Sequence, residues 1–289
     1  MGKVKTFLEM IKFEHTLFAL PFAYVGALLA GRAVRAGGFP TVAQIIWITL
    51  AMAGARTAAM SLNRLIDRHI DARNPRTTNR ALPAGLLRTG EVYGYVIASF
   101  LLLAFTAYQL NLLALELMPI AVFVLVFYSY TKRFTWASHL VLGIALGLAP
   151  VGAWIGVCGH WALSPVLLGL GVTNWVAGFD IVYACQDVEF DRAEGLHSIP
   201  AIFGVKRGLE ISALLHILAP LLFIAVGVVS GLNWLYYAGV AVAVVLLYRQ
   251  HRLVTERDLS KVGIAFFNLN GYLSVLLFVF TLLDLVIYK

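Results

Sequence analysis

Residues 43–71 read AQIIWITLAMAGARTAAMSLNRLIDRHID, a stretch that joins a long apolar run to an acidic segment. As a helix, the run from 43 to 62 is long enough to cross a hydrocarbon layer of ~30 Å. Arg56 lies inside this run, a costly position for a guanidinium unless it faces a polar cavity or an anion. Asn63, Asp67 and Asp71 follow at intervals of four, so a continuing helix presents them on one face. The stretch therefore predicts a membrane helix that ends in an acidic stripe.

The rest of the chain has the same membrane character. Of its 289 residues, 61% are hydrophobic and only 13% are charged, and the mean hydropathy is +0.84. A soluble domain cannot bury this much apolar surface, so composition excludes the soluble classes. Nine apolar runs predict an all-α polytopic bundle of nine transmembrane helices, with residues 1–289 forming a single domain. The runs lie near 16–31, 43–62, 92–110, 113–130, 138–157, 163–184, 211–230, 234–248 and 264–287.

The net charge of +7 indicates membrane topology rather than nucleic-acid binding. Most of the 22 Lys and Arg residues lie in alternate loops, whereas Arg32, Arg35 and Lys289 lie in the other set. Because loops rich in Lys and Arg stay in the cytoplasm, we expect a cytoplasmic N-terminus and an external C-terminus. The two longest polar interruptions, Asn63 to Thr89 and Cys185 to Gly208, then both face the cytoplasm.

A second acidic segment lies in residues 180–191, which read DIVYACQDVEFD. Tyr183, Asp187 and Asp191 repeat every four residues, and Asp180 lies about one turn earlier, deeper in the apolar run. Like charges at i and i+4 destabilise a helix, and carboxylates at the edge of hydrocarbon are costly, so two such sets require cations. Mg²⁺ binds carboxylate and phosphate oxygens, so the pattern predicts a magnesium site that holds a diphosphate. The predicted metal ligands are Asp67, Asp71, Asp187 and Asp191.

An alternative is that these aspartates are solvated loop charges, balanced by Arg64, Arg68 and Arg192. For one pair of aspartates the two interpretations would be equally good. The matched spacing of two sets on one side of the membrane favours the metal site.

These motifs, in this order, resemble the UbiA superfamily of intramembrane aromatic prenyltransferases and, within it, the 4-hydroxybenzoate polyprenyltransferase branch. The resemblance covers essentially the whole chain. It implies a bundle of nine membrane helices around a central cavity that opens to the cytoplasm and to lipid, in the inner or plasma membrane of a prokaryote. The motifs are Asn63-Arg64-x-x-Asp67-x-x-x-Asp71, Asn74-Pro75-Arg76-Thr77-x-x-Arg80-x-Leu82-Pro83-x-Gly85, Tyr130-Thr131-Lys132-Arg133 and Asp180-x-x-Tyr183-Ala184-x-x-Asp187-x-x-x-Asp191.

The resemblance also implies a reaction: the magnesium-dependent transfer of a polyprenyl group from polyprenyl diphosphate to a small aromatic acceptor, with 4-hydroxybenzoate as the expected acceptor in quinone biosynthesis. By this similarity the four aspartates bind Mg²⁺, and the reacting ring lies near Asp180 and Tyr183, which with Arg56 are the candidate catalytic residues. The expected partners are these two substrates and membrane lipid, and no nucleic acid. The candidate diphosphate-binding residues are Asn63, Arg56, Lys132 and Arg133.

Two features differ from the 4-hydroxybenzoate pattern. The loop reads Arg80-Ala81-Leu82-Pro83 where that branch usually has an arginine-proline pair, and the first span begins Phe13-Glu14-His15-Thr16-Leu17-Phe18, as in a related group linked to futalosine-route menaquinone synthesis. A (dihydroxy)naphthoate-type acceptor is therefore the alternative within this class of enzyme. A secondary transporter with embedded carboxylates is the alternative from another class, although it does not explain two matched acidic sets followed by basic loops.

Several isolated polar residues are expected to be structural. His139 and His216 lie near span ends or inside spans, where packing or interfacial roles are typical. Asn268 and Asn270 are expected to hydrogen-bond between helices. Asp284, near the outer end of the last run, is expected at the membrane interface.

Overall fold

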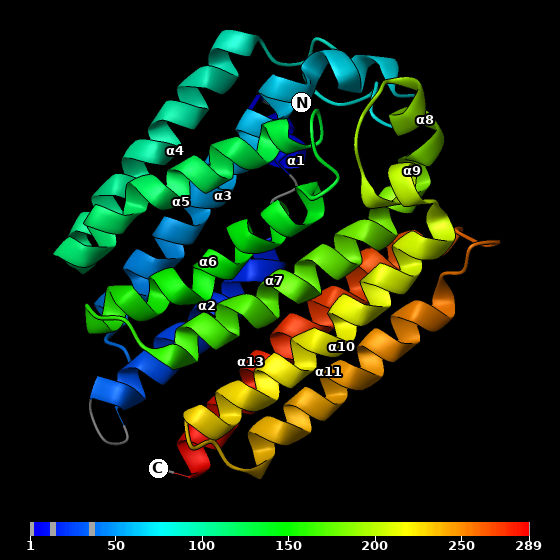
Figure 1. Ribbon diagram of the computed structural model, residues 1–289. Helices are drawn as coiled ribbons and strands as arrows, with labels where there is room; N and C mark the ends of the chain where they lie inside the picture. The colour runs from blue at the N-terminus through cyan, green and yellow to red at the C-terminus, as the bar shows by residue number, and fades with distance from the viewer. Residues whose placement is uncertain (1–2, 12–15, 35–37, 289) are drawn as a thin grey trace.

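The computed structural model describes residues 3–11, 16–34 and 38–288, and in these ranges the chain is almost entirely helical. The described ranges contain no β-strand, only an isolated bridge between Thr255 and Asp258. Figure 1 shows the long helices side by side in one bundle. The α-helices, long and short, are α1 (Lys3–Met10), α2 (Thr16–Val34), α3 (Val42–Arg73), α4 (Thr89–Leu110), α5 (Leu112–Thr131), α6 (Ser138–Cys158), α7 (Leu163–Ala184), α8 (Val188–Ala193), α9 (Ile199–Phe203), α10 (Val205–Val229), α11 (Trp234–Leu253), α12 (Val262–Ile264) and α13 (Asn270–Ile287).

Each of the nine expected spans corresponds to one long helix, which confirms the all-α membrane fold. By length and composition, seven helices in the described part of the chain can cross a membrane, and the apolar helix Phe18–Val34 is a shorter candidate. The remaining expected span is α11, with 20 residues. The chain starts and finishes at opposite ends of the bundle in Figure 1, in agreement with an odd number of crossings. A count of nine crossings, and the end that faces the cytoplasm, stay predictions.

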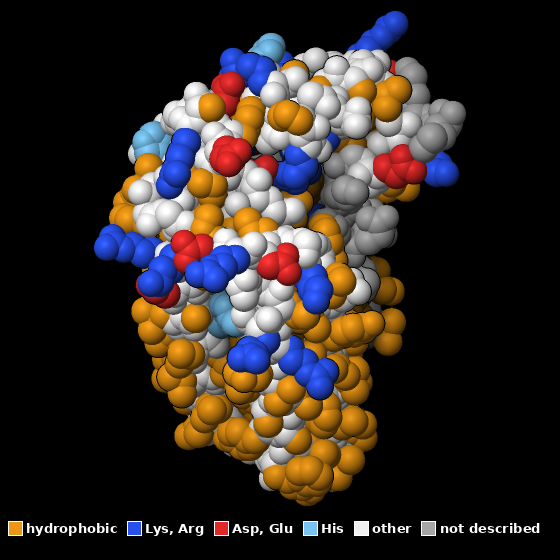
Figure 2. Space-filling model, turned by 90° about the vertical axis from the view of Figure 1, so that its right-hand side faces the viewer, with side chains coloured by type: hydrophobic (Ala, Val, Ile, Leu, Met, Phe, Trp, Pro, Cys, Tyr) orange, Lys and Arg blue, Asp and Glu red, His pale blue; other side chains and the backbone are white. Residues whose placement is uncertain are grey.

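Polar and apolar side chains separate along the length of the bundle. Figure 2 shows one face on which Lys, Arg, Asp and Glu gather over one half, while the other half is almost entirely hydrophobic. The charged half is the end that carries α8 and α9. Hydrocarbon accepts apolar side chains and excludes charged ones, so the uncharged half has the surface of a membrane-embedded region.

α3 is longer than a membrane requires. Its N-terminus is fixed by a capping box, in which Thr41 accepts a hydrogen bond from the Gln44 amide and the Gln44 side chain accepts one from the Thr41 amide. Its 32 residues extend for about 48 Å at 1.5 Å per residue, against a hydrocarbon layer of ~30 Å. The C-terminal turns of α3, which carry the first acidic motif, therefore reach beyond the apolar layer.

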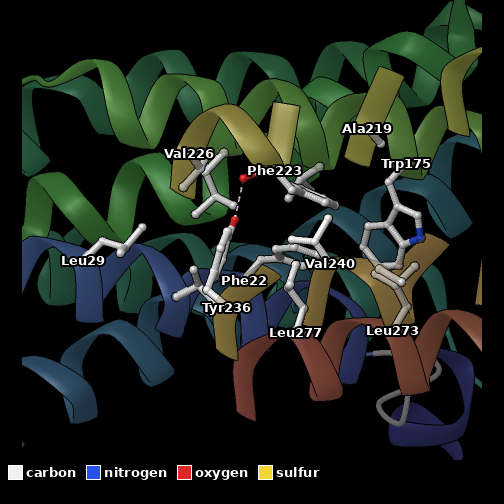
Figure 3. Close-up of a cluster of buried hydrophobic side chains, with 14 of the residues drawn as sticks. Phe22, Leu29, Trp175, Ala219, Phe223, Val226, Tyr236, Val240, Leu273 and Leu277 are labelled. Atoms are coloured by element: carbon white, nitrogen blue, oxygen red, sulfur yellow. Dashed lines mark hydrogen bonds between the residues drawn. The ribbon is translucent and has the colours of Figure 1, made fainter. Parts of the chain in front are cut away.

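The main hydrophobic core lies between α2, α7, α10, α11 and α13, away from the long α3. Phe22 of α2 packs against Trp175 of α7 and Phe223 of α10, with ring centroids 5.0 and 5.6 Å apart. Tyr236 of α11 is fully buried in the same cluster, and its hydroxyl donates a hydrogen bond of 2.8 Å to the Phe223 carbonyl (Figure 3). Asn270 accepts a hydrogen bond from the Trp175 indole, which confirms its expected interhelical role. This core makes a fixed scaffold for the helices that carry the second acidic motif.

The expectation that Asp284 lies at the interface is wrong. Its side chain on α13 is completely buried, and it accepts hydrogen bonds from the backbone amides of Asn233 at 2.9 Å and Tyr236 at 3.3 Å. These amides belong to the first turn of α11, whose own N-cap residue makes no side-chain cap. Asp284 thus caps a neighbouring helix, where an acidic group also faces the positive end of the helix dipole.

Replacing Asp284 with alanine will destabilise the fold by about 2–6 kcal/mol, because the partly buried Asn233 amide and the buried Tyr236 amide lose their acceptor, and an unsatisfied buried donor costs about 1–3 kcal/mol. The free energy of unfolding in mixed micelles measures the change. Glu116→Ala is the control, since Glu116 is also a single acid in a long apolar helix but is exposed. Equal stability of the two variants would contradict this capping role.

Candidate active site

A cavity of about 1000 Å³ lies between α3, α5, α6 and α7. Its wall is polar at the end of the bundle where α3 extends beyond the apolar layer, and apolar elsewhere. All but one of the ten candidate site residues line it; the exception is Arg133. The nine that line it are Arg56, Asn63, Asp67, Asp71, Lys132, Asp180, Tyr183, Asp187 and Asp191.

Asp67 is held by residues of α3 and by the segment that follows α5. One carboxylate oxygen, Oδ2, contacts Lys132 Nζ at 2.8 Å and accepts a hydrogen bond of 3.1 Å from Asn63, while Oδ1 accepts one of 2.7 Å from Arg133. Arg133 also donates to the carbonyls of Ser129 and Ile66, at 2.7 and 3.1 Å. Asp67 is 2% exposed, so these contacts compensate a nearly buried charge.

Asp71, one turn further along α3, is paired with a different cation. Its Oδ1 accepts a hydrogen bond of 2.7 Å from Arg80, which the loop after α3 folds back over the helix end. Thr77 fixes that loop by donating to the Asp71 carbonyl at 2.9 Å. Oδ2 of Asp71 is buried and has no hydrogen-bond partner within the described ranges, and the nearest cation, Arg64 Nη1, is 4.0 Å away.

Arg76 connects the loop after the first acidic motif to the second acidic motif. Its Nε donates to Asp187 Oδ1 at 2.8 Å, its Nη2 pairs with Oδ2 of the same carboxylate, and its Nη1 donates to the Tyr183 hydroxyl at 2.9 Å. Asn74 also donates to Asp187, at 3.4 Å. Burial lowers the pKa of the Arg76 guanidinium, but hydrogen bonds to Asp187 and Tyr183 outweigh burial and raise it above its usual value. A bidentate ion pair thus fastens the loop after the first motif to Asp187 of the second, and the aspartates of both motifs line the same cavity.

The second motif does not lie on one uninterrupted α-helix as expected. α7 ends at Ala184, residues Cys185–Asp187 form a 3-10 turn, and α8 begins at Val188. A 3-10 turn has about 3.0 residues per turn instead of 3.6, so it rotates the following side chains relative to α7. Asp191 consequently hydrogen-bonds to Ser198 at 2.8 Å, whereas Asp187 faces Arg76.

Asp180 lies deeper in the cavity and is not isolated. Its Oδ2 is 2.7 Å from Nδ1 of His139, in the first turn of α6. The expectation that His139 has only a packing or interfacial role is therefore wrong, because this imidazole contacts a candidate catalytic carboxylate. The residues are 41 positions apart, so no local spacing could have indicated the contact.

The apolar part of the cavity follows α5 along its length. Ala114, Leu117, Ala121, Leu125 and Tyr128 recur every three or four residues and line it. The opposite face of α5 is exposed and apolar, and Ser129 and Thr131 are the only fully buried residues of this helix. α5 is therefore a wall one helix thick between the cavity and the outside. The large exposed side chains of that face include Leu112, Phe123 and Phe127.

Sequence reasoning assigned no site role to several residues that the structure places here. Arg76 and Arg80 were part of a motif, but motif membership does not show which carboxylate each arginine contacts. Arg64 is 9% exposed and lines the cavity beside Asp71 rather than balancing a solvated loop. Its side chain donates to Asn63 at 3.2 Å.

The donor atoms of the site suit a magnesium ion that binds together with a diphosphate. No three His, Cys, Asp or Glu side chains within the described ranges converge as a ready-made metal cluster. Mg²⁺ does not need one, because it usually takes one or two carboxylates and completes its shell with substrate phosphates and water. The unpartnered Oδ2 of Asp71 supplies an available hard oxygen ligand.

An all-helical bundle with apolar outer surfaces, in which aspartates and basic side chains line one end of a largely apolar cavity, has the architecture of an integral membrane enzyme. Residues 19–272 match the UbiA prenyltransferase family, and the chain belongs to this family. It is therefore a prenyltransferase.

Similar proteins agree with this assignment over most of their lengths. The chain is 31% identical over 223 residues to 4-hydroxybenzoate octaprenyltransferase of Enterobacter sp. (strain 638), covering 77% of this chain and 76% of that protein. It is 30% identical over 266 residues to the enzyme of the same name from Marinomonas sp. (strain MWYL1), covering 89% and 90%.

Solved structures share the fold. A UbiA homolog from Aeropyrum pernix K1, in its apo form, is 35% identical, with a TM-score of 0.84 over 94% of this chain and 98% of that chain. A UbiA homolog from Archaeoglobus fulgidus bound to GPP and Mg²⁺ has a TM-score of 0.74 at 20% identity, over 97% and 99% of the two chains. At that identity the second likeness shows the fold alone.

Proposed function

We propose that this protein transfers a polyprenyl group from polyprenyl diphosphate to 4-hydroxybenzoate, with Mg²⁺ as cofactor and with its active site open to the cytoplasm. The observation that carries the proposal is that the aspartates of both motifs line one largely apolar cavity, with Arg76 of the intervening loop paired to Asp187. A polyprenyl diphosphate has matching chemistry, since it joins an anionic head to a hydrocarbon tail. The relatives named for 4-hydroxybenzoate and the fold neighbour bound to GPP and Mg²⁺ support the same proposal.

The head group would be held by opposite charges. Asp67, Asp71, Asp187 and Asp191 would hold Mg²⁺, which when bound neutralises negative charge that develops on the departing diphosphate. Lys132 contacts Asp67 and lies in the cavity wall, so its ammonium can instead pair with a phosphate oxygen when the metal takes the carboxylate. Arg76, now paired with Asp187, can likewise pair with a phosphate oxygen when the metal takes that carboxylate. Arg80, now paired with Asp71, can do the same. Preorganised cations of this kind lower the barrier to ionisation of the substrate.

The chemistry of the ring requires a base. In the proposed reaction the bond between the allylic carbon and the diphosphate oxygen breaks, and its electron pair leaves with diphosphate. Asp180 accepts the proton of the acceptor's hydroxyl, a ring carbon forms the new carbon–carbon bond, and the proton on that carbon leaves to solvent as aromaticity is restored. Asp180 then returns its proton to the phenolate. The aromatic ring of Tyr183 at the cavity wall can stabilise the allylic cation.

The tail would lie in the apolar part of the cavity. The cavity extends along α5 to Leu110 and Trp161, at the far end from the carboxylates. The apolar lining on α5 runs from Ala114 to Tyr128, about 21 Å along the helix at 1.5 Å per residue. A cavity of this length accommodates several isoprene units and favours a polyprenyl over a short prenyl donor.

The direct test of this proposal incubates the purified protein in lipid vesicles with Mg²⁺, a labelled polyprenyl diphosphate and a panel of acceptors. We expect labelled product with 4-hydroxybenzoate, detected by chromatography. The panel includes 1,4-dihydroxy-2-naphthoate and 1,4-dihydroxy-6-naphthoate. Product only with a naphthoate would replace the proposed acceptor while keeping the reaction, whereas no product with any acceptor would contradict the proposal.

A further inference from the structure

The imidazole of His139 is fixed on both sides. It is 4% exposed, and its Nδ1 lies 2.7 Å from Oδ2 of Asp180. On the other side of the ring, Nε2 accepts a hydrogen bond of 3.3 Å from the backbone amide of Ile199, in the first turn of α9. Rotation of the ring would break both contacts.

These contacts determine which nitrogen of His139 carries the proton. A backbone amide can only donate, so Nε2 must be the unprotonated acceptor. The proton of a neutral imidazole then lies on Nδ1 and is donated to Asp180. Oδ2 of Asp180 is thereby occupied, and Oδ1 becomes the oxygen that can take a proton from an acceptor.

The amide that fixes His139 belongs to a segment with two other contacts to the site. We refer to residues 197–199 as the strap. The His197 amide donates to the Lys132 carbonyl at 2.7 Å, and the Ser198 hydroxyl donates to Asp191 at 2.8 Å. Ser198 also caps α9 by accepting from the Ala201 amide at 3.3 Å. Each of the three residues of the strap therefore holds one residue of the site. These are Lys132, Asp191 and His139.

We infer that His139 is a positioning residue for Asp180, held by the strap in the tautomer that donates to the carboxylate. The inference rests on the proposed function, in which Asp180 acts on the acceptor's hydroxyl. Loss of the Nδ1–H donor would let the Asp180 carboxylate rotate. It would also free Oδ2, so that either oxygen of the carboxylate could take a proton. The effect falls on turnover, because His139 lies beside Asp180 and away from the pairs formed by Asp67, Asp71 and Asp187.

Steady-state kinetics of three variants test this role. His139→Leu should lower kcat by about tenfold to a hundredfold, the usual loss when a partner of a functional residue is removed, with KM for the polyprenyl diphosphate within about twofold of wild type. His139→Asn should recover much of the rate, because the asparagine amide can donate from nearly the position of Nδ1. Asp180→Asn should lower kcat at least as much, and adding His139→Leu to it should cause little further loss, since coupled residues are not additive.

Two controls separate this role from damage to the fold. His216→Leu removes an imidazole that is equally buried, at 4% exposure, but bonds to the Trp175 carbonyl outside the cavity wall. We expect it to keep a near-normal kcat in the folded fraction. Wild-type kcat in His139→Leu, no recovery in His139→Asn, or additive losses in the double variant would each overturn the inference.

A measurement independent of activity tests the geometry. In protein labelled with ¹⁵N-histidine, His139 should give the nitrogen shifts of a neutral ring protonated on Nδ1, and its signals are assigned by their loss in His139→Asn. A proton on Nε2 would overturn the inference even if the enzyme is active. If wild type transfers no prenyl group to any acceptor, the proposed function fails while this measurement still decides the tautomer.

Discussion

Asp67→Asn and Asp187→Asn should each lower prenyl transfer by about a hundred- to a thousandfold, the loss typical when one preorganised electrostatic group is removed from an active site. Each change replaces a proposed carboxylate ligand by a neutral amide of nearly the same volume. Asp67 contacts Lys132 and Arg133, and Asp187 contacts Arg76, so each variant also leaves a cation without its anion. The double variant should fall to the rate without enzyme. Initial rates with labelled donor measure these losses.

Glu189→Gln is the matched control. Glu189 lies between Asp187 and Asp191 in the sequence, is exposed, and does not line the cavity. The same change of charge at this position should leave the rate within about twofold, as expected for a surface charge screened by solvent. Near-normal rates in both aspartate variants, or an equal loss in Glu189→Gln, would show that these carboxylates do not form the metal site.

Removal of divalent ions with EDTA should abolish transfer, and Mg²⁺ should restore it, because the diphosphate leaves only when its charge is neutralised. The stability of the fold should not change when the divalent ions are removed. Each of Asp67, Asp71 and Asp187 is already paired with a Lys or Arg side chain without metal. We therefore expect the unfolding midpoint in detergent to be the same with EDTA and with Mg²⁺.

This pair of measurements also distinguishes an enzyme from a transporter that uses embedded carboxylates. Transfer that continues in EDTA would contradict the magnesium requirement. A large fall in the unfolding midpoint would instead indicate a structural ion, which binds the folded state and stabilises it by mass action.

Local periodicity was enough to predict the helices and the first acidic stripe. α3 continues without a break from its apolar run through Asn63, Asp67 and Asp71, so the spacing of four placed all three on one face. The second motif had the same spacing, but the 3-10 turn at Cys185–Asp187 changed the direction of its side chains. Asp187 at the end of that turn contacts Arg76 of the loop after α3, and spacing along one segment contains no information on such a contact.

Contacts between distant segments account for the wrong expectations. His139 and Asp284 each read as a single polar residue in an apolar run, for which a packing or interfacial role is the usual outcome. In the fold, His139 meets an acid 41 residues away, and Asp284 meets an amide 51 residues away. A buried polar group requires a partner, so the sequence indicates that partners exist, but only helix packing decides which they are.

The single-helix wall formed by α5 has a consequence for how the enzyme is supplied. Under the proposed function, only α5 separates a bound polyprenyl tail from the surrounding lipid, so a donor or product that passes beside this helix does not have to be extracted into water. Donor and product then exchange within the plane of the bilayer. The rate of this exchange depends on how fast lipids move past α5. Turnover should accordingly follow the fluidity of the surrounding membrane, a property that detergent-solubilised protein would lose.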